Sequence, residues 1–266
     1  MTTTRSSRVK PISRRAPVVV ALVPAAGRGI RMGGSVPKQF LSLGGEPLVV
    51  QSLRTLQAAP VVDQIVLAVP SADIEYCEKE IVSRHRFTKV ACVVPGGAER
   101  QDSVRHALAQ VHPETEIVLI HDAVRPFVTQ GMIEEVVAAA RKEGAAIIAL
   151  PMRDTVKQVR ADGTIERTVN RTPLWLAQTP QAFRRDWIEA AHKKAYDEGI
   201  RATDDALLME WLGHSVAVVE GSGENIKVTR PEDLVIGEAI LTSRIKEARR
   251  ARNARKANLA DKRESL

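Results

Sequence analysis

Residues 24–38 hold the side chains with the clearest potential for chemistry. The segment reads PAAGRGIRMGGSVPK, so small residues surround the cations Arg28, Arg31 and Lys38. Small residues let the backbone approach a ligand closely, and successive N–H groups can then point at phosphate oxygens. Phosphoryl chemistry needs such positioning, together with positive charge where negative charge develops. The segment therefore predicts a phosphate site; the alternatives are a purely structural turn and, for Lys38, a solvated loop lysine.

Two other glycine-rich phosphate motifs do not fit these residues. A Walker loop needs GxxxxGK followed by Ser or Thr, and no such run occurs. The dinucleotide fingerprint GxGxxG fails because Gly33 follows Gly27 and Gly29 one residue too late. The loop therefore belongs to another class of phosphate binder.

Strands and helices alternate five times around this loop. Runs of aliphatic residues predict buried strands at 18–23, 64–69, 89–94, 116–120 and 145–150. Helical patterns lie between them, at 47–58, after a Ser71 cap, at 99–110 and from a Thr129 cap to Arg141. This alternation predicts an α/β fold with a Rossmann-like, mostly parallel sheet flanked by helices. Ligands of such sheets bind beyond the carboxyl ends of the strands, where the loops after Val23, Val94 and Ile120 lie.

The alternation ends after residue 150. Residues 155–160 and 164–169 alternate apolar and polar side chains around Asp162-Gly163, which predicts a protruding β-hairpin arm over about 151–171. A lone hairpin is marginally stable in water, so we expect the arm to pack on a second subunit, with an ordinary surface ribbon as the alternative. The elements expected after the arm are a strand at 174–178, helices at 185–198 and 204–212, a strand at 215–220, and a helix from Pro231 to about Ala257.

The charge of the chain is concentrated at its ends. The net charge is +7 over 266 residues, but residues 1–19 hold five cations and no acid, and residues 244–266 hold nine cations against three acids. The middle is therefore mildly acidic, and the basic balance argues only weakly for a nucleic-acid partner. We expect a disordered tail at 1–17, a folded α/β domain at 18–243, and a basic helical extension or tail at 244–266.

Compartment and redox state follow from what the sequence lacks. No apolar stretch reaches the ~18 residues that a membrane helix needs, and the N-terminus has no apolar signal region. Cys77 and Cys92 form no CxxC or metal spacing and are expected to be reduced thiols. We expect a cytoplasmic protein without membrane contact; the short, Arg-rich N-terminus leaves a plastid protein as the alternative.

The chain resembles a known family at seven places. Pro24-Ala-Ala-Gly-x-Gly-x-Arg-Met, closed by Pro37-Lys38-Gln39, is similar to the signature of sugar-phosphate nucleotidyltransferases, and within them to the 2-C-methyl-D-erythritol 4-phosphate cytidylyltransferase family. Six further blocks follow in the order of that family: PGGAERQDS from Pro95, HDAVRP from His121, PMRDTVK from Pro151, LAQTPQ from Leu176, TDD from Thr203 and NIKVTRP from Asn225. The resemblance covers residues 18–240.

This resemblance implies CMP transfer from CTP to 2-C-methyl-D-erythritol 4-phosphate, with release of pyrophosphate, in non-mevalonate isoprenoid precursor biosynthesis. The catalytic residues that it implies are Arg31, Lys38 and Lys227. The nucleotide-binding residues that it implies are Ala25, Ala26, Gly27, Gly29, Gly97, Ser103 and Asp122. The acceptor-binding residues that it implies are Arg125, Thr155, Arg171, Thr179 and Thr203. It also implies Mg²⁺ or another divalent cation, held mainly by the CTP phosphates with help from Asp122, and a homodimer joined through the arm.

Several positions leave alternatives open. Ala98 stands where a family member has Asp, which weakens the preference for cytidine slightly. Thr203 stands at the start of a predicted helix, where helix capping alone would explain it. Without the resemblance, Lys227 would be interpreted as an exposed lysine at a strand edge. His121 is expected to be packed and not to act as a base. The alternative functions are cytidylyl transfer to another polyol phosphate, such as ribitol 5-phosphate, and a non-catalytic nucleotide-binding protein.

Overall fold

A seven-stranded sheet forms the centre of the fold. The computed structural model describes residues 18–27 and 37–264, with side chains described up to residue 253. The strands follow the order β11-β7-β10-β6-β1-β4-β5. They are β1 (Val19–Pro24), β4 (Gln64–Val69), β5 (Val90–Pro95), β6 (Ile117–Ile120), β7 (Ala145–Pro151), β10 (Trp175–Arg184) and β11 (Ala217–Glu220). Only β10 of this sheet runs antiparallel to its neighbours, β6 and β7, so the prediction of a mostly parallel sheet is confirmed.

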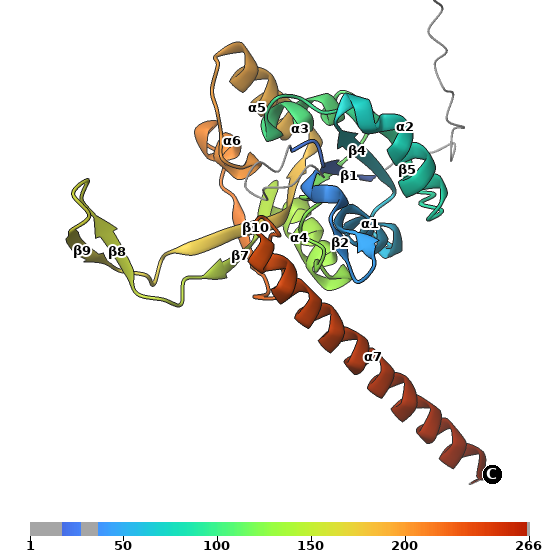
Figure 1. The fold of residues 1–266 in the computed structure, drawn as a ribbon. Helices are drawn as coiled ribbons and strands as arrows, with labels where there is room; N and C mark the ends of the chain where they lie inside the picture. Colours follow the sequence, from blue (N-terminus) through green and yellow to red (C-terminus); the bar gives the residue numbers. More distant parts are fainter. Residues whose placement is uncertain (1–17, 28–36, 265–266) are drawn as a thin grey trace, which may run out of the picture.

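Helices cover both faces of the sheet (Figure 1). One face packs against α1 (Leu48–Ala58) and α4 (Gln130–Glu143), and the other against α3 (Arg100–Leu108), α5 (Arg185–Asp197) and α6 (Asp205–Trp211). Alternate residues of β1 enter the two cores, and all five from Val19 to Val23 are at most 1% exposed. Burial on both faces explains why this strand is a continuous apolar run.

The predicted Ser71 cap is wrong. Ser71 lies inside a 3₁₀ turn, η3 (Ser71–Asp73), and no side-chain cap is made there or at the short α2 (Ile74–Tyr76) that follows. The chain then continues as a π-helical segment, η4 (Cys77–Ser83). Because the turn starts directly after Pro70, the Ser71 hydroxyl is one turn too early to cap the helix. By contrast, the Thr129 cap is confirmed, since its side chain accepts a hydrogen bond from the Met132 N–H.

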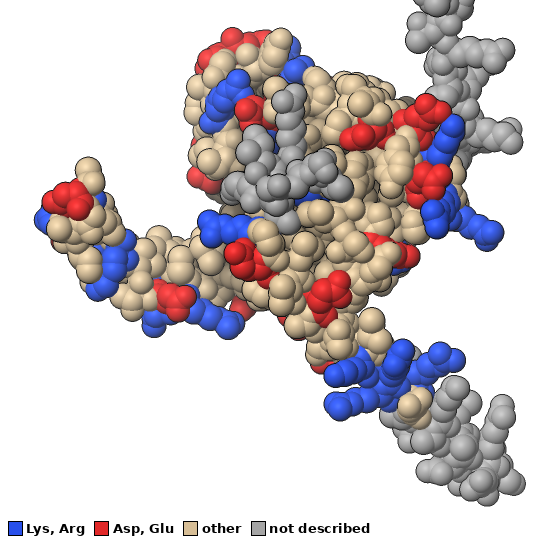
Figure 2. Space-filling model, viewed as in Figure 1, with Lys and Arg blue, Asp and Glu red and all other residues tan. Residues whose placement is uncertain are grey.

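Two segments project from the domain in different directions (Figure 1). The arm consists of β8 (Val156–Val159) and β9 (Ile165–Val169), which pair only with each other and are largely exposed. The other segment is the long helix α7 (Pro231–Glu264). Lys and Arg side chains gather where α7 leaves the domain, as Figure 2 shows. No helix in the described ranges is long and apolar enough to cross a membrane.

Residues 38–47, which lead into α1, face the start of α7. After the 3₁₀ turn η2 (Lys38–Phe40), the two-residue strands β2 (Ser42–Leu43) and β3 (Glu46–Pro47) form a small hairpin. Leu43 and Phe127 share a buried cluster with Leu241 of α7. This packing fixes the start of α7 beside the loops at the carboxyl edge of the sheet.

Candidate active site

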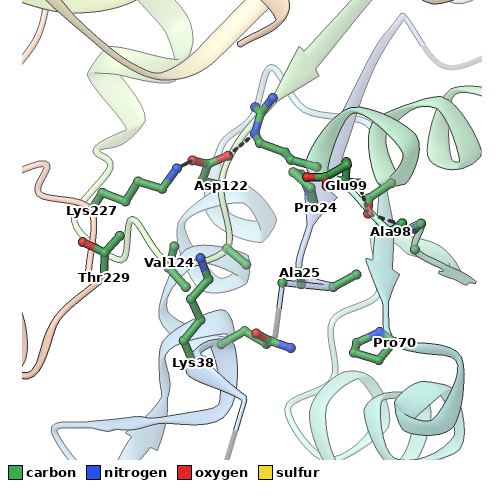
Figure 3. Close-up of a pocket in the computed structure, with 18 of the residues that line it drawn as sticks. Pro24, Ala25, Lys38, Pro70, Ala98, Glu99, Asp122, Val124, Lys227 and Thr229 are labelled. Atoms are coloured by element: carbon green, nitrogen blue, oxygen red, sulfur yellow. Dashed lines mark hydrogen bonds and ion pairs between the residues drawn. The ribbon is translucent and has the colours of Figure 1, made fainter. Parts of the chain in front are cut away.

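A pocket of about 820 Å³ opens at the carboxyl edge of the sheet (Figure 3). Its wall is built from the residues that follow β1, β5 and β6, the loops that the sequence placed at this edge. Pro70 and Ser71, which follow β4, also line it, and the η2 turn and the segment before α7 contribute Lys38, Lys227 and Thr229. Segments far apart in the sequence therefore meet here because parallel strands end at a common edge.

The wall after β5 has no room for side chains at its two glycines. A Cβ atom on Gly96 would lie 2.2 Å from the Cβ of Ala26, and one on Gly97 would lie 2.1 Å from the Cβ of Asp102. The Gly97 N–H donates to the Ser103 hydroxyl oxygen at 3.0 Å, so these two residues, both expected to bind the nucleotide, lie side by side. Backbone thus forms this part of the pocket surface, which suits close contact with a planar ring.

Gly27 and Lys38 face each other across the first loop. A Cβ atom on Gly27 would lie 3.2 Å from the Lys38 Cε atom, so the absence of a side chain gives the lysine its place. Figure 3 shows the Lys38 side chain extending toward the side of the pocket where Asp122 and Lys227 lie. Ala25 and Ala26 line the same wall. Arg31 and Gly29, also predicted here, lie outside the described residues.

Asp122 is held by two cations at once. Its Oδ1 accepts from Arg100 Nε at 2.8 Å, and its Oδ2 is 2.6 Å from Lys227 Nζ. Burial alone would raise the pKa of this carboxyl, but the charges and hydrogen bonds of Arg100 and Lys227 hold it below its usual range. Asp122 is therefore ionised, and the opposed charges at this end of the pocket are Lys227, Asp122 and Arg100.

Three residues predicted to bind the acceptor lie outside the pocket lining. Arg125 Nη1 donates to the Asn225 carbonyl at 2.8 Å, which ties the loop after β6 to the segment carrying Lys227. The Thr179 hydroxyl is buried and lies 3.1 Å from both the Asp122 N–H and His121 Nδ1. Thr203 is exposed, just before Asp204, which caps α6 through the Leu207 N–H. In this structure, Arg125 and Thr179 support the pocket from behind.

The two arm residues predicted to bind the acceptor are exposed and also lie outside the pocket lining. Thr155 precedes β8, and Arg171 follows β9 and donates to the Arg153 carbonyl. One chain therefore brings together Lys38, Asp122 and Lys227 but does not bring Thr155 or Arg171 to them.

His121 is packed, as expected. It is fully buried, with Nε2 3.1 Å from the Arg125 carbonyl oxygen and Nδ1 facing Thr179. Burial lowers the pKa of His121 to about 4, so the ring is neutral at physiological pH. It does not line the pocket.

Two pocket residues escaped the sequence reasoning. Arg100 lies at the first position of α3 and pairs with Asp122 and, at 2.7 Å, with Asp205. A cation at a helix N-terminus is unfavourable with respect to the helix dipole, and this placement was the feature of the sequence that could have indicated another role for Arg100. Gln39 is 1% exposed, and both polar atoms of its amide have no hydrogen-bond partner within the described residues. Its only signal was its place directly after Lys38.

The described residues contain no cluster of three or more His, Cys, Asp or Glu that could hold a metal ion by themselves. A divalent ion here would need oxygen ligands from a bound molecule, which suits Mg²⁺ and its preference for phosphates and few carboxylates. Asp122 is the ionised carboxylate at the pocket wall beside the cations. The expected donor set, one Asp with ligand phosphates, is therefore compatible with this site.

Comparison with known proteins gives one family. The sequence pattern of IspD, 2-C-methyl-D-erythritol 4-phosphate cytidylyltransferase, matches residues 19–243. A relative of that name from Syntrophus aciditrophicus is 50% identical over 225 residues, 85% of this chain and 96% of the relative.

Solved structures agree with this result. The "4-diphosphocytidyl-2C-methyl-D-erythritol synthase" from Anaerococcus prevotii is 32% identical with a TM-score of 0.74, covering 84% of this chain and 96% of its own. The 2-C-methyl-D-erythritol 4-phosphate cytidylyltransferase from Thermus thermophilus is 35% identical with a TM-score of 0.70, covering 84% and 98%. The matched ranges contain the pocket and the arm, and the chain therefore belongs to the 2-C-methyl-D-erythritol 4-phosphate cytidylyltransferase family.

Proposed function

We propose that this protein transfers CMP from CTP to 2-C-methyl-D-erythritol 4-phosphate and releases pyrophosphate, in the cytoplasmic synthesis of isoprenoid precursors. The observation that carries the proposal is the pocket itself. A side-chain-free wall for a base, at Gly96 and Gly97, lies in the same cavity as Lys38 and Lys227, which suit phosphates. Family membership supports the same substrates.

The reaction needs positioning and charge more than a protein nucleophile. An acceptor phosphate oxygen attacks the α-phosphorus of CTP in line, the bond to the bridging oxygen breaks, and pyrophosphate leaves with its electrons. Lys38 and Lys227 both line the pocket, and in this proposal their positive charges stabilise the reacting phosphates. Within the described pocket lining there is no Cys or His. We keep Arg31 as a third cation of this group on the strength of the sequence motif.

A divalent cation, Mg²⁺ in the first instance, belongs to the proposal. Asp122 and the CTP phosphates would hold it, and it would supply positive charge to the triphosphate. The residues of the chain do the rest: the Gly96–Gly97 wall orients the base, and Lys227 and Lys38 orient the phosphates. Removal of divalent metal by EDTA should abolish turnover, and Mg²⁺ should restore it.

We further propose that a second copy of the chain completes the acceptor side. Thr155 and Arg171 are exposed on an arm that reaches away from the domain of its own chain (Figure 1). Large apolar side chains on and beside the arm are also exposed: Val159, Ile165, Trp175 and Leu176. Arg suits an acceptor phosphate because its guanidinium can form paired hydrogen bonds.

An acceptor panel tests the proposed function. Pyrophosphate release is measured with CTP, Mg²⁺ and either 2-C-methyl-D-erythritol 4-phosphate or ribitol 5-phosphate, with ATP and GTP as nucleotide controls. We expect turnover with CTP and the methylerythritol acceptor. Turnover with ribitol 5-phosphate alone would replace the acceptor, and absence of turnover with both, while CTP still binds, would favour a non-catalytic nucleotide-binding protein.

A further inference from the structure

A row of ion pairs leads from the pocket into the protein. Lys227 pairs with Asp122, Asp122 with Arg100, and Arg100 with Asp205. Asp205 continues the row, since its Oδ1 lies 2.9 Å from His192 Nε2 on α5. The row connects the segment before α7, the loop after β6, and the helices α3, α6 and α5. Its pocket end carries a lysine proposed to act on the reacting phosphates.

Neither helix capping nor the helix dipole explains why an arginine stands at position 100. It occupies the first position of α3, after the Glu99 N-cap, where backbone N–H groups point outward and a cation is disfavoured. The capping box between Glu99 and Asp102 already satisfies this helix end. Arg100 is nonetheless turned inward, and the two carboxylates that it meets are 7% and 2% exposed. Buried ion pairs are weak sources of stability, so their retention favours a role in fixing geometry.

Arg100 is anchored at its far end by a rigid carboxylate. Asp205 holds His192 through Oδ1 and Arg100 through Oδ2, and its backbone N–H donates to Gln181 Oε1 at 3.2 Å. Gln181 belongs to β10 and pairs directly with Ile120, two residues before Asp122. Asp205 and Asp122 are therefore both tied to the part of the sheet where Gln181 pairs with Ile120, and the Arg100 side chain bridges the two carboxylates.

The two carboxylate oxygens of Asp122 therefore have different partners. Arg100 Nε donates to Oδ1, while the Asp122 backbone N–H donates to the Thr179 hydroxyl, so Arg100 holds the side chain and Thr179 holds the backbone of this residue. Oδ2 is left for the pocket, and Lys227 Nζ lies against it at 2.6 Å. Without Arg100 the carboxylate could rotate about its χ2 bond, and Lys227 would lose a fixed partner.

We propose that Arg100 is a positioning residue of the reaction, which clamps Asp122 to Asp205 and thereby fixes Oδ2 and the Lys227 ammonium for the reacting phosphates. This inference rests on the proposed cytidylyl transfer. Arg100 acts through Asp122 and need not touch the substrates, so its loss lowers kcat more than it raises KM. A displacement on the order of 1 Å in such a site costs ~100-fold in rate.

The test compares four variants by pyrophosphate release and by thermal unfolding. Arg100→Gln breaks both ion pairs, Arg100→Lys keeps one charge but cannot span both carboxylates, and Asp205→Asn weakens only the far anchor, outside the pocket. The matched control is Gln101→Ala: Gln101 is the next residue of α3 and bonds Ile200 and Ala202 across the same junction, without contacting Asp122.

We expect kcat to fall ~100-fold in Arg100→Gln, less in Arg100→Lys and about 10-fold in Asp205→Asn, with KM for CTP changed by less than about threefold. Gln101→Ala should lower the unfolding temperature and leave kcat within about twofold of the wild type, since it removes only hydrogen bonds. Equal losses of kcat in Gln101→Ala and Asp205→Asn would overturn the proposal, because general loosening of the junction would explain both.

A crystal structure of Arg100→Gln separates this inference from the proposed function. We expect the Asp122 carboxylate to turn and the Lys227–Asp122 pair to open while the Gly96–Gly97 wall stays in place. If Asp122 and Lys227 keep their positions, Arg100 does not position them, whatever the acceptor panel shows. If the pair opens but the wild type fails to use CTP, the proposed function is wrong and the clamp stands as a structural fact.

Discussion

The pocket and the arm are stabilised in opposite ways. The pocket wall is fixed from within one chain, by glycines packed too tightly for a Cβ and by ion pairs at a carboxylate that is 7% exposed. The arm has a ladder between two exposed strands and side-chain bonds across it, such as Lys157 to Thr168 at 2.7 Å and Gln158 to Glu166 at 2.8 Å. Exposed polar pairs of that kind contribute little stability.

This difference separates the chemistry from the choice of acceptor. Charge stabilisation at a phosphorus atom requires cations in fixed positions, and Lys227, paired with the buried Asp122, is such a cation in the pocket. In our proposal the arm selects the acceptor where a second copy of the chain meets it, and Thr155 and Arg171 act there. We therefore propose that the domain of one chain binds the nucleotide and that acceptor specificity is acquired on dimerisation.

Lys227→Ala tests the role of the pocket and should have the largest effect among the variants of the pocket and the arm. The variant removes a cation from the phosphates and leaves the buried Asp122 with Arg100 alone, so kcat should fall by about 10²–10³. Pyrophosphate release under saturating CTP measures the effect. Lys246→Ala, at an exposed lysine of α7 that does not line the pocket, is the control and should keep full activity. Equal activity of the two variants would remove Lys227 from the reaction.

Arg171→Ala tests the arm half. Alone it should lower activity by about 10- to 100-fold, mainly through KM for the acceptor, because a charged contact to phosphate is lost. Mixed with Lys227→Ala and allowed to exchange subunits, it should recover about a quarter of wild-type activity, because half of the dimers then carry one intact composite site. Lack of recovery, with exchange verified by mass, would show that the arm does not act on a partner.

The sequence was sufficient for the pocket where its signals are local. The strand predicted at 64–69 is observed at Gln64–Val69, because an apolar run buried on both faces has a distinct pattern. Glycine-rich turns after β1 and β5 marked the edge where the pocket opens. Roles at Lys38, Asp122 and Lys227 came from the resemblance, and the structure adds that these residues share one cavity.

Non-local contacts set the limit of that reasoning. Arg100 and Asp205 lie 105 positions apart, and neither sequence neighbourhood shows that they meet. The strand predicted at 174–178 is observed as Trp175–Arg184, since it continues past an irregularity between Ala177 and Gln181 to pair with both β6 and β7. The alternation of residue types along the sequence is interrupted where strand pairing is irregular, whereas the strand itself continues as far as its neighbouring strands pair with it.

Gly96→Ala tests whether the shape of the pocket wall positions the nucleotide. The new Cβ would lie 2.2 Å from Ala26 and 2.9 Å from the Ser103 hydroxyl, so the base wall must shift. We expect KM for CTP to rise by about 10-fold with a smaller change in kcat, since positioning of the base suffers first. The control is Gly223→Ala, where a Cβ meets nothing within 4 Å. A similar KM in both variants would show that the wall does not contact the nucleotide.

The smallest expected effect concerns acid stability and again belongs to the pocket region. His121 lies behind the pocket with its pKa lowered to about 4 by burial, whereas an unfolded histidine titrates near its ordinary 6.5. The unfolded chain therefore binds a proton first as the pH falls, so the stabilising contribution is complete above pH 6.5 and is lost between 6.5 and 4. The wild type should lose about 1 kcal/mol of unfolding free energy from this residue between pH 7 and 5.5.

Urea unfolding of His121→Gln at these two pH values measures that contribution. The variant should be less stable than the wild type at pH 7, because the contacts of His121 with Arg125 and Thr179 are altered. Its dependence on pH should nevertheless be shallower by about 1 kcal/mol, since no buried imidazole remains to resist protonation. His112→Gln, at an exposed histidine, should keep the wild-type slope. If both variants kept that slope, the acid sensitivity would not arise behind the pocket, and the pocket would not differ from the exposed arm in this respect.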